Sequence, residues 1–514
     1  MIQEHAPGLV PGVLFFGTVR GSLPSRQPIC RPRFSLVSSA QESQAQVLRL
    51  PAVKLDAQGR RSVDLRAVIA LAVPLFVNSS IQALLNLTDT WFIGRLSTDA
   101  TAAVGASYWF LIVAILLFGG TGLAVQTLAA QAYGAGDNRS AARAVWAGMW
   151  GMLLVAPAFV AIAFCGPTII DWLRLEPNVA QLAGEFWFPR MLGGMLAVGI
   201  WSTTGFFNGI GRTGVTLAIM TFVAVLNAIL NQIFIFELGW GISGSAWATT
   251  AAMFAGLMLA LALFASRAID QEYHSRRTWR PNAADLARLF RVGIPIGLFP
   301  AIDVGGLAMF QAMQVAAGAV GGAATQIVMM LTSLAYLPTM GFALAGTTLV
   351  GQSIGAGNKD WATRVGNATI KLAVAYMGLV TVFLAVIGPW LIPLFVNPSD
   401  PNAAAVISLG RTLLWFAAGY QIFDGLNLGA GFCLRGAGDM RVPTVAIVFL
   451  SWFGFVPFTH MFTFAPGQGW VDFLPQYGYG TVGGWAVALV YTCILGSLIY
   501  LRWRSGAWRR IDLR

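Results

Sequence analysis

Charged residues are scarce in this chain of 514 residues, at 10% of the total against roughly 25% in a typical soluble domain. Hydrophobic residues make up 57%. Apolar stretches of roughly 20 residues, the length that crosses a bilayer, recur between residues 65 and 502. Their centres lie near residues 80, 114, 154, 195, 225, 255, 303, 334, 380, 418, 452 and 491. The pattern predicts an all-α membrane protein with twelve transmembrane helices.

Metal-binding and nucleotide-binding motifs are also missing. The 4 cysteines share no motif spacing and the 3 histidines are scattered, so we expect neither a disulfide framework nor a transition-metal site. No Walker motif occurs, and the two Gly-Ala-Gly stretches at 134–136 and 355–357 follow no strand. We interpret them as tight turns. We therefore expect no cofactor, no use of ATP and no enzyme activity.

The net charge of +11 follows from topology. With the first helix starting inside, twenty-one Lys and Arg residues after residue 59 fall on the inner side and four on the outer side. This asymmetry is the positive-inside rule. It predicts cytoplasmic termini and a multi-pass protein whose partner is the lipid bilayer. The 29 arginines against 3 lysines indicate a GC-rich coding sequence, which favours a bacterial source and thus the bacterial inner membrane. We expect no nucleic-acid partner.

The chain repeats itself at an offset of 221 residues without gaps. The matches include Pro74 with Pro295, Gly120 with Gly341, Thr127 with Thr348, Gln131 with Gln352 and Arg143 with Arg364. A weaker match relates 209–213 to 436–440. Six helices thus occur twice, which predicts two pseudo-symmetric six-helix lobes around a central cavity, a common plan of transporters.

The expected organisation has five parts. Residues 1–60 form a disordered or mis-started N-terminal tail, 61–270 an N-lobe with helices one to six, and 271–284 a cytoplasmic linker between the lobes. Residues 285–505 form a C-lobe with helices seven to twelve, and 506–514 a basic C-terminal tail. We expect a monomer.

Acids at membrane depth are rare, costly and usually functional. Asp89 lies near the end of the first apolar stretch, and Asn227 and Asn231 are spaced i and i+4 on one face of helix five. With Thr249 of helix six they supply the oxygens that suit Na⁺ or a carboxyl that exchanges a proton. The alternative is a hydrogen-bonded cluster that only holds helices together.

A second candidate cation site lies in the C-lobe. Tyr420 and Asp424 are spaced i and i+4 in helix ten, and Asp303 follows Pro300 by three residues in helix seven. Prolines release backbone carbonyls that can join an ion site. The alternative for Asp303 is the cap of a broken helix.

Aromatic side chains are candidates for lining a cavity that binds flat lipophilic cations. The alternative is packing or lipid contact. The candidates are Tyr108, Trp109, Trp201, Phe206, Tyr336 and Trp415.

Several stretches together resemble one family. They are VPLFVNSSIQALLNLTDTWFIGRL (73–96), GLAVQTLAAQAYGAGD (122–137), NAILNQIFIF (227–236), GIPIGLFPAID (293–303), VGQSIGAGNKD (350–360) and YQIFDGLNLGAGFCLRGAGD (420–439). The chain is similar over residues 65–505 to the multidrug and toxic compound extrusion (MATE) family, particularly its NorM-like bacterial members.

The resemblance implies a twelve-helix antiporter in which an inward Na⁺ or H⁺ gradient drives the export of small organic cations or drugs. Asp89, Asn227, Asn231 and Thr249 match the family's N-lobe cation site, and Tyr420 and Asp424 match a C-lobe site. Two positions depart from the family pattern. Asp303 stands where the NorM-like members have a glutamate, and Asn231 stands where some relatives have an aspartate.

Two other functions remain open at this point. A lipid-linked-sugar flippase of the same wider superfamily would need Arg or Lys in its cavity to bind phosphate, and the sequence shows no such residue well inside a span. An intramembrane aspartyl protease is suggested by the GxGD pattern that ends at Asp439, with Asp424 as partner. Its flanking residues Arg435 and Arg441 place Asp439 at a cytoplasmic helix end, which argues against the protease.

Overall fold

The computed structural model describes residues 50–55, 57–172, 175–396 and 401–513, and these are almost entirely helical. A short antiparallel hairpin precedes the helices, with β1 (Val53–Leu55) paired to β2 (Arg61–Val63). The indole of Trp361 donates to the carbonyl of Pro51 at 2.9 Å, which fastens the hairpin to the helices. The predicted tail, residues 1–60, thus extends too far, because this hairpin begins at Val53; residues 1–49 lie outside the described part.

Within the described residues twelve long helical segments follow, and each of the twelve predicted centres falls in one of them. In the N-lobe these are α2 (Leu65–Gly94), α3 (Thr98–Gly134), α4 (Asn138–Phe164), α6 (Pro177–Gly209), α7 (Thr213–Asn231) with the π-helix η1 (Gln232–Glu237), and α8 (Gly241–Phe264). In the C-lobe they are α10 (Ala283–Ala316), α11 (Ala319–Gly355), α12 (Lys359–Val386), α14 (Ala403–Ala437), α15 (Arg441–Val448) with the π-helix η4 (Phe449–Phe455) and α16 (Val456–Thr463), and α17 (Gly480–Arg504). Shorter elements are α5 (Gly166–Trp172), α9 (Arg267–Tyr273), η2 (Ser275–Arg277), α13 (Gly388–Leu391), η3 (Ile392–Phe395) and η5 (Ala507–Arg510).

Ten of these segments are long and apolar enough to cross a membrane, and α11 makes eleven if its two halves, bent by 46°, count as one span. The twelfth is α6, which carries Glu185 and Arg190 along its 33 residues. Large apolar side chains on the outer faces of the helices, such as Leu84, Leu379 and Phe453, are more than half exposed. Such a surface suits lipid, so the protein is an all-α, multi-pass membrane protein.

The sequence repeat is also a structural repeat. Helix α3 coincides with α11 when shifted by 221 residues, at both its first and its last residue. The Gly-Ala-Gly stretches are tight turns, as predicted: Gly136 and Gly357 have φ of +74° and +77°, which favours glycine. The next residues, Asp137 and Asn358, each cap the following helix by accepting from the backbone N–H three residues on, at 2.9 and 2.8 Å.

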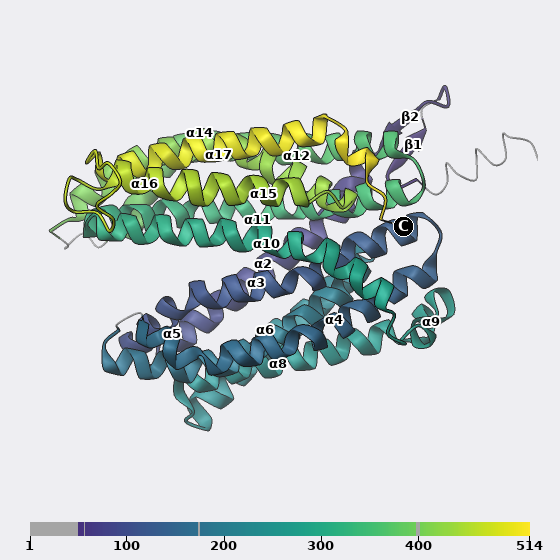
Figure 1. Ribbon diagram of the computed structural model, residues 1–514, viewed down its shortest axis with the longest axis horizontal. Coiled ribbons are helices and arrows are strands. Elements are labelled where there is room, and N and C mark those ends of the chain that lie inside the picture. Colours follow the sequence, from purple (N-terminus) through teal and green to yellow (C-terminus); the bar gives the residue numbers. More distant parts are fainter. Residues whose placement is uncertain (1–49, 56, 173–174, 397–400, 514) are drawn as a thin grey trace, which may run out of the picture. The chain divides into compact units, whose positions relative to one another are not determined.

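The first helix of each lobe packs against the other lobe. A Cβ atom on Gly120 of α3 would lie 2.4 Å from the backbone nitrogen of Gly297 in α10. In the repeat-related position, a Cβ on Gly341 of α11 would lie 2.8 Å from the carbonyl oxygen of Ala72 in α2. Both glycines thus allow backbones to meet closely, which is typical of membrane helices. Figure 1 shows α10 running between the two groups of helices.

Candidate functional site

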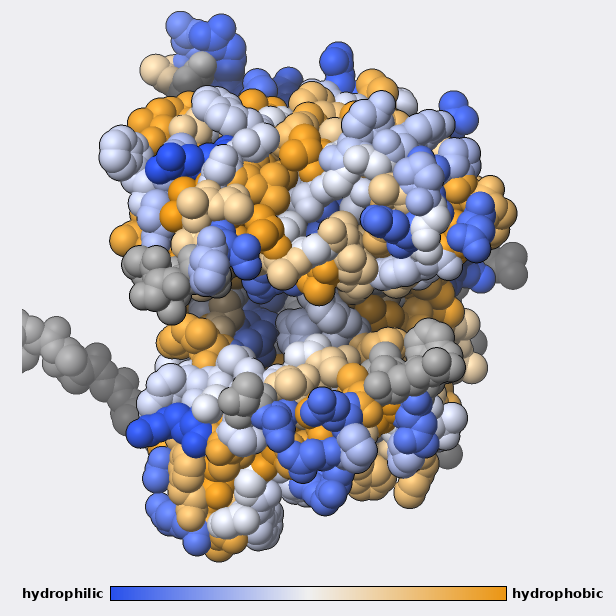
Figure 2. Space-filling view, turned by 90° about the vertical axis from the view of Figure 1, so that its left-hand side faces the viewer, coloured by the Kyte–Doolittle hydropathy of each residue, from blue (hydrophilic) through white to orange (hydrophobic). Residues whose placement is uncertain are grey.

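A cavity of about 490 Å³ lies between the two lobes and is lined by helices of both. Figure 2 looks onto the end of the molecule that carries α5 and shows a hollow between the lobes there. The lining combines apolar side chains with amides, hydroxyls and two carboxylates. Among the lining residues are Asn78, Gln82, Asn86, Gln126, Trp201, Asn208, Met220, Phe299, Asp303, Tyr336, Asp424, Asn427 and Arg435.

The two carboxylates in this cavity are Asp303 on α10 and Asp424 on α14, which lie close enough to interact electrostatically. Asp303 accepts a hydrogen bond of 3.0 Å from the hydroxyl of Tyr491 on α17, a residue that the sequence analysis missed. Nothing in the pattern around Tyr491 distinguishes it from a packing aromatic. The helix α10 continues through Pro295 and Pro300. Asp303 is therefore not the cap of a broken helix.

The predicted third member of this group, Tyr420, lies elsewhere. Its ring stacks on the buried Trp485, with ring centroids 6.4 Å apart and planes at 18°. It is not among the residues that line the cavity. The structure therefore brings Asp303 and Asp424 together in one cavity, whereas Tyr420 packs against Trp485 inside the C-lobe.

The four predicted N-lobe residues form a closed ring of hydrogen bonds between α2, α7 and α8. The amide of Asn231 donates to Asp89 Oδ1 at 2.6 Å, and the hydroxyl of Thr249 lies 3.0 Å from Asp89 Oδ2. Asn231 also donates to Asn227 Oδ1, and Asn227 donates to Thr249 Oγ1, both at 3.1 Å. A single carboxylate is thus held by neutral donors.

Two buried polar atoms, one in this ring and one beside it, lack a hydrogen-bond partner among the described residues. Asn231 Oδ1 and the hydroxyl of Ser245 are buried without a hydrogen-bond partner in the described part of the chain. The helix α7 changes to the π-helix η1 directly after Asn231, and such π-segments are frequent at functional sites. Turning the amide of Asn231 would offer its oxygen in place of its N–H, so the ring can exchange a donor for an acceptor facing Asp89.

One arginine corrects the expectation that no cation lies well inside a span, and a second lines the cavity from a helix end. Arg190, one of the four basic residues counted on the outer side, lies within α6, close enough to Asp89 to interact electrostatically. Arg435 on α14 lines the cavity, is 6% exposed, and donates from Nη2 to the carbonyl of Leu123 at 2.8 Å. Arg435 lies in the last turn of α14, which ends at Ala437, so the cavity reaches as far as this helix end.

The aromatic candidates separate into two groups. Trp201 and Tyr336 line the cavity. The other four do not, which corrects their assignment to its lining. Phe206 is fully buried against Phe207, Phe264 and Tyr273 in the N-lobe core. Tyr108 and Trp109 make an edge-to-face contact, and Trp415 is 65% exposed on the outer face of α14.

At the end opposite the hollow, the lobes are joined by hydrogen bonds from α3 to the end of α14. The hydroxyl of Thr127 donates to the carbonyl of Arg435, and the amide of Gln131 donates to that of Gly436, both at 3.0 Å. These bonds close the gap between the lobes beyond the cavity.

The repeat-related bonds complete this inter-lobe contact. The hydroxyl of Thr348 donates to the carbonyl of Asn208 at 3.0 Å, and the amide of Gln352 donates to that of Gly209 at 2.8 Å. A Cβ on Gly134 would lie 1.9 Å from the carbonyl oxygen of Gln352, so only glycine fits there. The sequence repeat includes these positions, but the sequence alone predicted no role for them.

The GxGD pattern does not form a protease site. Asp439 is 2% exposed and accepts a hydrogen bond of 2.8 Å from Arg502 Nε in an ion pair. It begins the turn after α14, at the end of the molecule that holds the inter-lobe contact, and is absent from the cavity lining that contains Asp424.

The comparisons with known proteins agree with this architecture. The MatE family model matches residues 74–233 and 306–459, one stretch in each lobe. A probable multidrug resistance protein NorM of Pseudomonas putida is 30% identical over 457 residues, covering 86% of this chain and 95% of the relative. A probable NorM of Rhizobium meliloti is 28% identical over 455 residues, covering 85% and 92%.

Solved structures show the same fold. A crystal structure of MATE in complex with MaL6 has a TM-score of 0.74 at 21% identity and covers 86% of this chain and 97% of that one. An outward-facing conformation of a multidrug resistance MATE family transporter has a TM-score of 0.73 at 21% identity and covers 86% and 96%. The two-lobe helical fold, its internal repeat and these matches establish that the chain belongs to the MatE family and is a NorM-like multidrug efflux transporter.

Proposed function

We propose that the chain is a cation-coupled antiporter of the bacterial inner membrane that exports organic, cationic and lipophilic compounds by alternating access, driven by Na⁺ or H⁺. The observation that carries the proposal is the pair of carboxylates, Asp303 and Asp424, in an inter-lobe cavity. The hollow at one end of the molecule and the inter-lobe contact at the other support one-sided access.

The cavity suits a flat organic cation. Its volume of about 490 Å³ is in the range of small-molecule pockets, roughly 300–1,000 Å³. The rings of Trp201, Phe299 and Tyr336 line it beside the two acids. Aromatic faces attract desolvated cations, and the carboxylates provide the opposite charge.

The coupling ion has a separate place in this proposal. Asp89 is not among the cavity-lining residues, but Asn86 and Gln82, one and two turns before it on α2, are. Likewise α7 carries the lining residue Met220 and, two turns later, Asn227. Neutralising Asp89 by a proton or Na⁺ removes the demand for two donors, so α2 and α7 can rearrange together. Such a change favours one state of the transporter over the other.

The charge distribution supports an outward-facing state. The inter-lobe contact lies at the end that carries the arginine-rich linker between α8 and α10, and the positive-inside rule assigns that end to the cytoplasm. The hollow then opens to the outside, and both chain termini are cytoplasmic.

The proposal is tested by export of a fluorescent organic cation from proteoliposomes. An imposed Na⁺ gradient and an imposed proton gradient are applied in separate experiments, with Asp424→Asn beside the wild type. We expect one gradient to drive export, and the variant to lose at least tenfold in apparent affinity for the dye. Export under neither gradient would overturn the antiporter.

If that outcome were found, the alternative function would be a lipid-linked-sugar flippase. Arg435 supplies the cavity with one cation, but its Nη2 is bound to the carbonyl of Leu123 and it shares the cavity with two carboxylates. This charge balance favours a cationic cargo over a phosphate.

A further inference from the structure

A second pocket lies outside the transport cavity, between the start of α4 and the linker that joins the lobes. The linker is held against α4 by two indole groups one helical turn apart. Trp146 Nε1 donates to the carbonyl of Ser275 at 2.6 Å, and Trp150 Nε1 donates to that of Trp279 at 2.8 Å. The linker backbone therefore has a fixed position along one face of α4.

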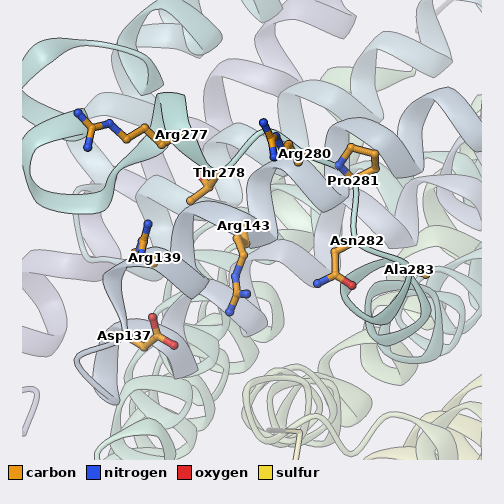
Figure 3. A pocket seen from close by; sticks show the side chains of 9 residues that line it. All are labelled: Asp137, Arg139, Arg143, Arg277, Thr278, Arg280, Pro281, Asn282 and Ala283. Atoms are coloured by element: carbon orange, nitrogen blue, oxygen red, sulfur yellow. The ribbon is translucent and has the colours of Figure 1, made fainter.

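Four arginines surround this pocket, whose volume is about 640 Å³. Arg139 and Arg143 are spaced i and i+4 on α4, and Arg277 and Arg280 come from the linker. Figure 3 shows the linker pair on one side and the α4 pair on the other, with Arg277 extended away from the other three. All four side chains are exposed, so they are free to turn toward a shared ligand.

The nearby acids leave most of this charge unpaired. Asp137 caps α4 and accepts hydrogen bonds from the backbone N–H and the hydroxyl of Ser140. Burial opposes ionisation of Asp137, but these bonds and the neighbouring Arg143 and Arg139 hold its pKa below the usual value. Asp285 lies 3.9 Å from Arg143. Within the described residues, Arg139, Arg277 and Arg280 make no ion pair.

The C-lobe provides an internal comparison, because a pocket at its related position contains the C-terminal segment in place of the linker. The residue that corresponds to Arg139 at the 221 offset is Asp360, which pairs with Arg509 of that segment at 2.9 Å. Arg509 also donates to Thr363. In the C-lobe the two sides of the pocket thus attract each other, whereas in the N-lobe both sides are positive.

We propose that the N-lobe pocket binds the phosphate group of an anionic ligand. Guanidinium groups bind phosphate oxygens in a fixed, often bidentate geometry, and a phosphate placed among them offsets their mutual repulsion. The pocket lies at the start of α4. The 27 residues of this helix span about 40 Å and so reach beyond the roughly 30 Å hydrocarbon core.

This depth is where phospholipid headgroups lie. Clusters of arginines beside a membrane helix bind anionic lipids, and Trp279, half exposed beside the cluster, is of the type that anchors at the interface. A soluble phosphate compound shares the same chemistry.

The test uses the full-length protein purified in detergent and titrated with short-chain phospholipids. Dioctanoyl phosphatidylglycerol is the anionic probe, dioctanoyl phosphatidylcholine the neutral one, and pyrophosphate the soluble one; binding is followed as the rise in unfolding temperature. The variants are Arg277→Gln with Arg280→Gln, and Arg139→Asp, which installs the C-lobe charge. The matched control is Arg504→Gln with Arg510→Gln, two exposed arginines beside the C-lobe pocket.

We expect phosphatidylglycerol to bind the wild type in preference to phosphatidylcholine, and the linker variant to bind it about 25-fold more weakly, roughly fivefold for each arginine. Arg139→Asp should lose the preference, and the control should keep it. Saturation by pyrophosphate without a preference between lipids would support phosphate binding from a soluble source. Equal losses in the control and the linker variant, or no preference for any phosphate probe, would overturn the proposal. Dye export is not measured, so this result is independent of the proposed antiport.

Discussion

Replacing Asp89 by asparagine separates its two proposed roles, a structural hydrogen-bond acceptor and a carrier of charge. The asparagine keeps the size of the side chain and one oxygen that accepts from Asn231 or Thr249. It removes the charge that a coupling ion would neutralise. We therefore expect the variant to fold and to lose ion-driven export.

The size of each effect follows from the ring. Hydrogen bonds to a charged group contribute about 1.5–3 kcal/mol and neutral ones about 1 kcal/mol. Two bonds to the Asp89 carboxylate become weaker, but the cost of burying a charge disappears. The free energy of unfolding should therefore fall by less than about 2 kcal/mol. Coupling free energies between two sites are typically about 1–3 kcal/mol, so export driven by the gradient should fall about 5- to 150-fold.

The assay is efflux of a fluorescent cation from proteoliposomes under the gradient that drives the wild type. Asp472→Asn is the matched control, because it removes an exposed carboxylate from the loop before α17. Thermal unfolding of both variants checks that they are folded. Export by Asp89→Asn at the wild-type rate would refute the reasoning and leave the ring as a structural cluster.

Three further predictions concern the cavity, the inter-lobe contact and a helix cap. Tyr491→Phe removes the donor to Asp303 and should weaken the apparent affinity for the cation about 10- to 150-fold, as 1.5–3 kcal/mol for a bond to a charge implies; dye efflux against dye concentration measures it, and an unchanged affinity contradicts it. Thr127→Val with Thr348→Val removes two bonds of about 1 kcal/mol each, so cysteine labelling should show the inter-lobe contact open roughly 30-fold more often, whereas unchanged labelling would mean that it does not control opening. Asp137→Ala should lower stability by about 1 kcal/mol at neutral pH. Because the folded-state pKa of Asp137 is lowered, this difference should be present above about pH 4 and vanish as the pH falls through the lowered pKa. Thermal melts in which the difference stays constant with pH would contradict the assignment of Asp137 as the cap.

Much of the architecture follows from local properties of the chain. A span of about 20 apolar residues has one stable arrangement in lipid, a helix with all its backbone bonds made internally, so the twelve centres were predictable. The offset of 221 predicted two lobes, because equal sequences fold into equal units. The i and i+4 spacing of Asn227 and Asn231 placed them on one face, and an acid in another apolar span, Asp89, had few other partners.

Other features depended on the tertiary structure. Helical periodicity shows which residues share a face but not whether that face meets lipid, a neighbouring helix or the cavity, since all three accept aromatic side chains. For this reason Trp201 lines the cavity while Phe206, five residues later, is buried in the core. The packing of the lobes brings Arg435, in the last turn of α14, to the cavity, and it places Arg190 of α6 near Asp89. The pairing of Thr127 with a carbonyl of α14 joins residues 308 positions apart, and only the packing of the two lobes brings such distant groups into contact.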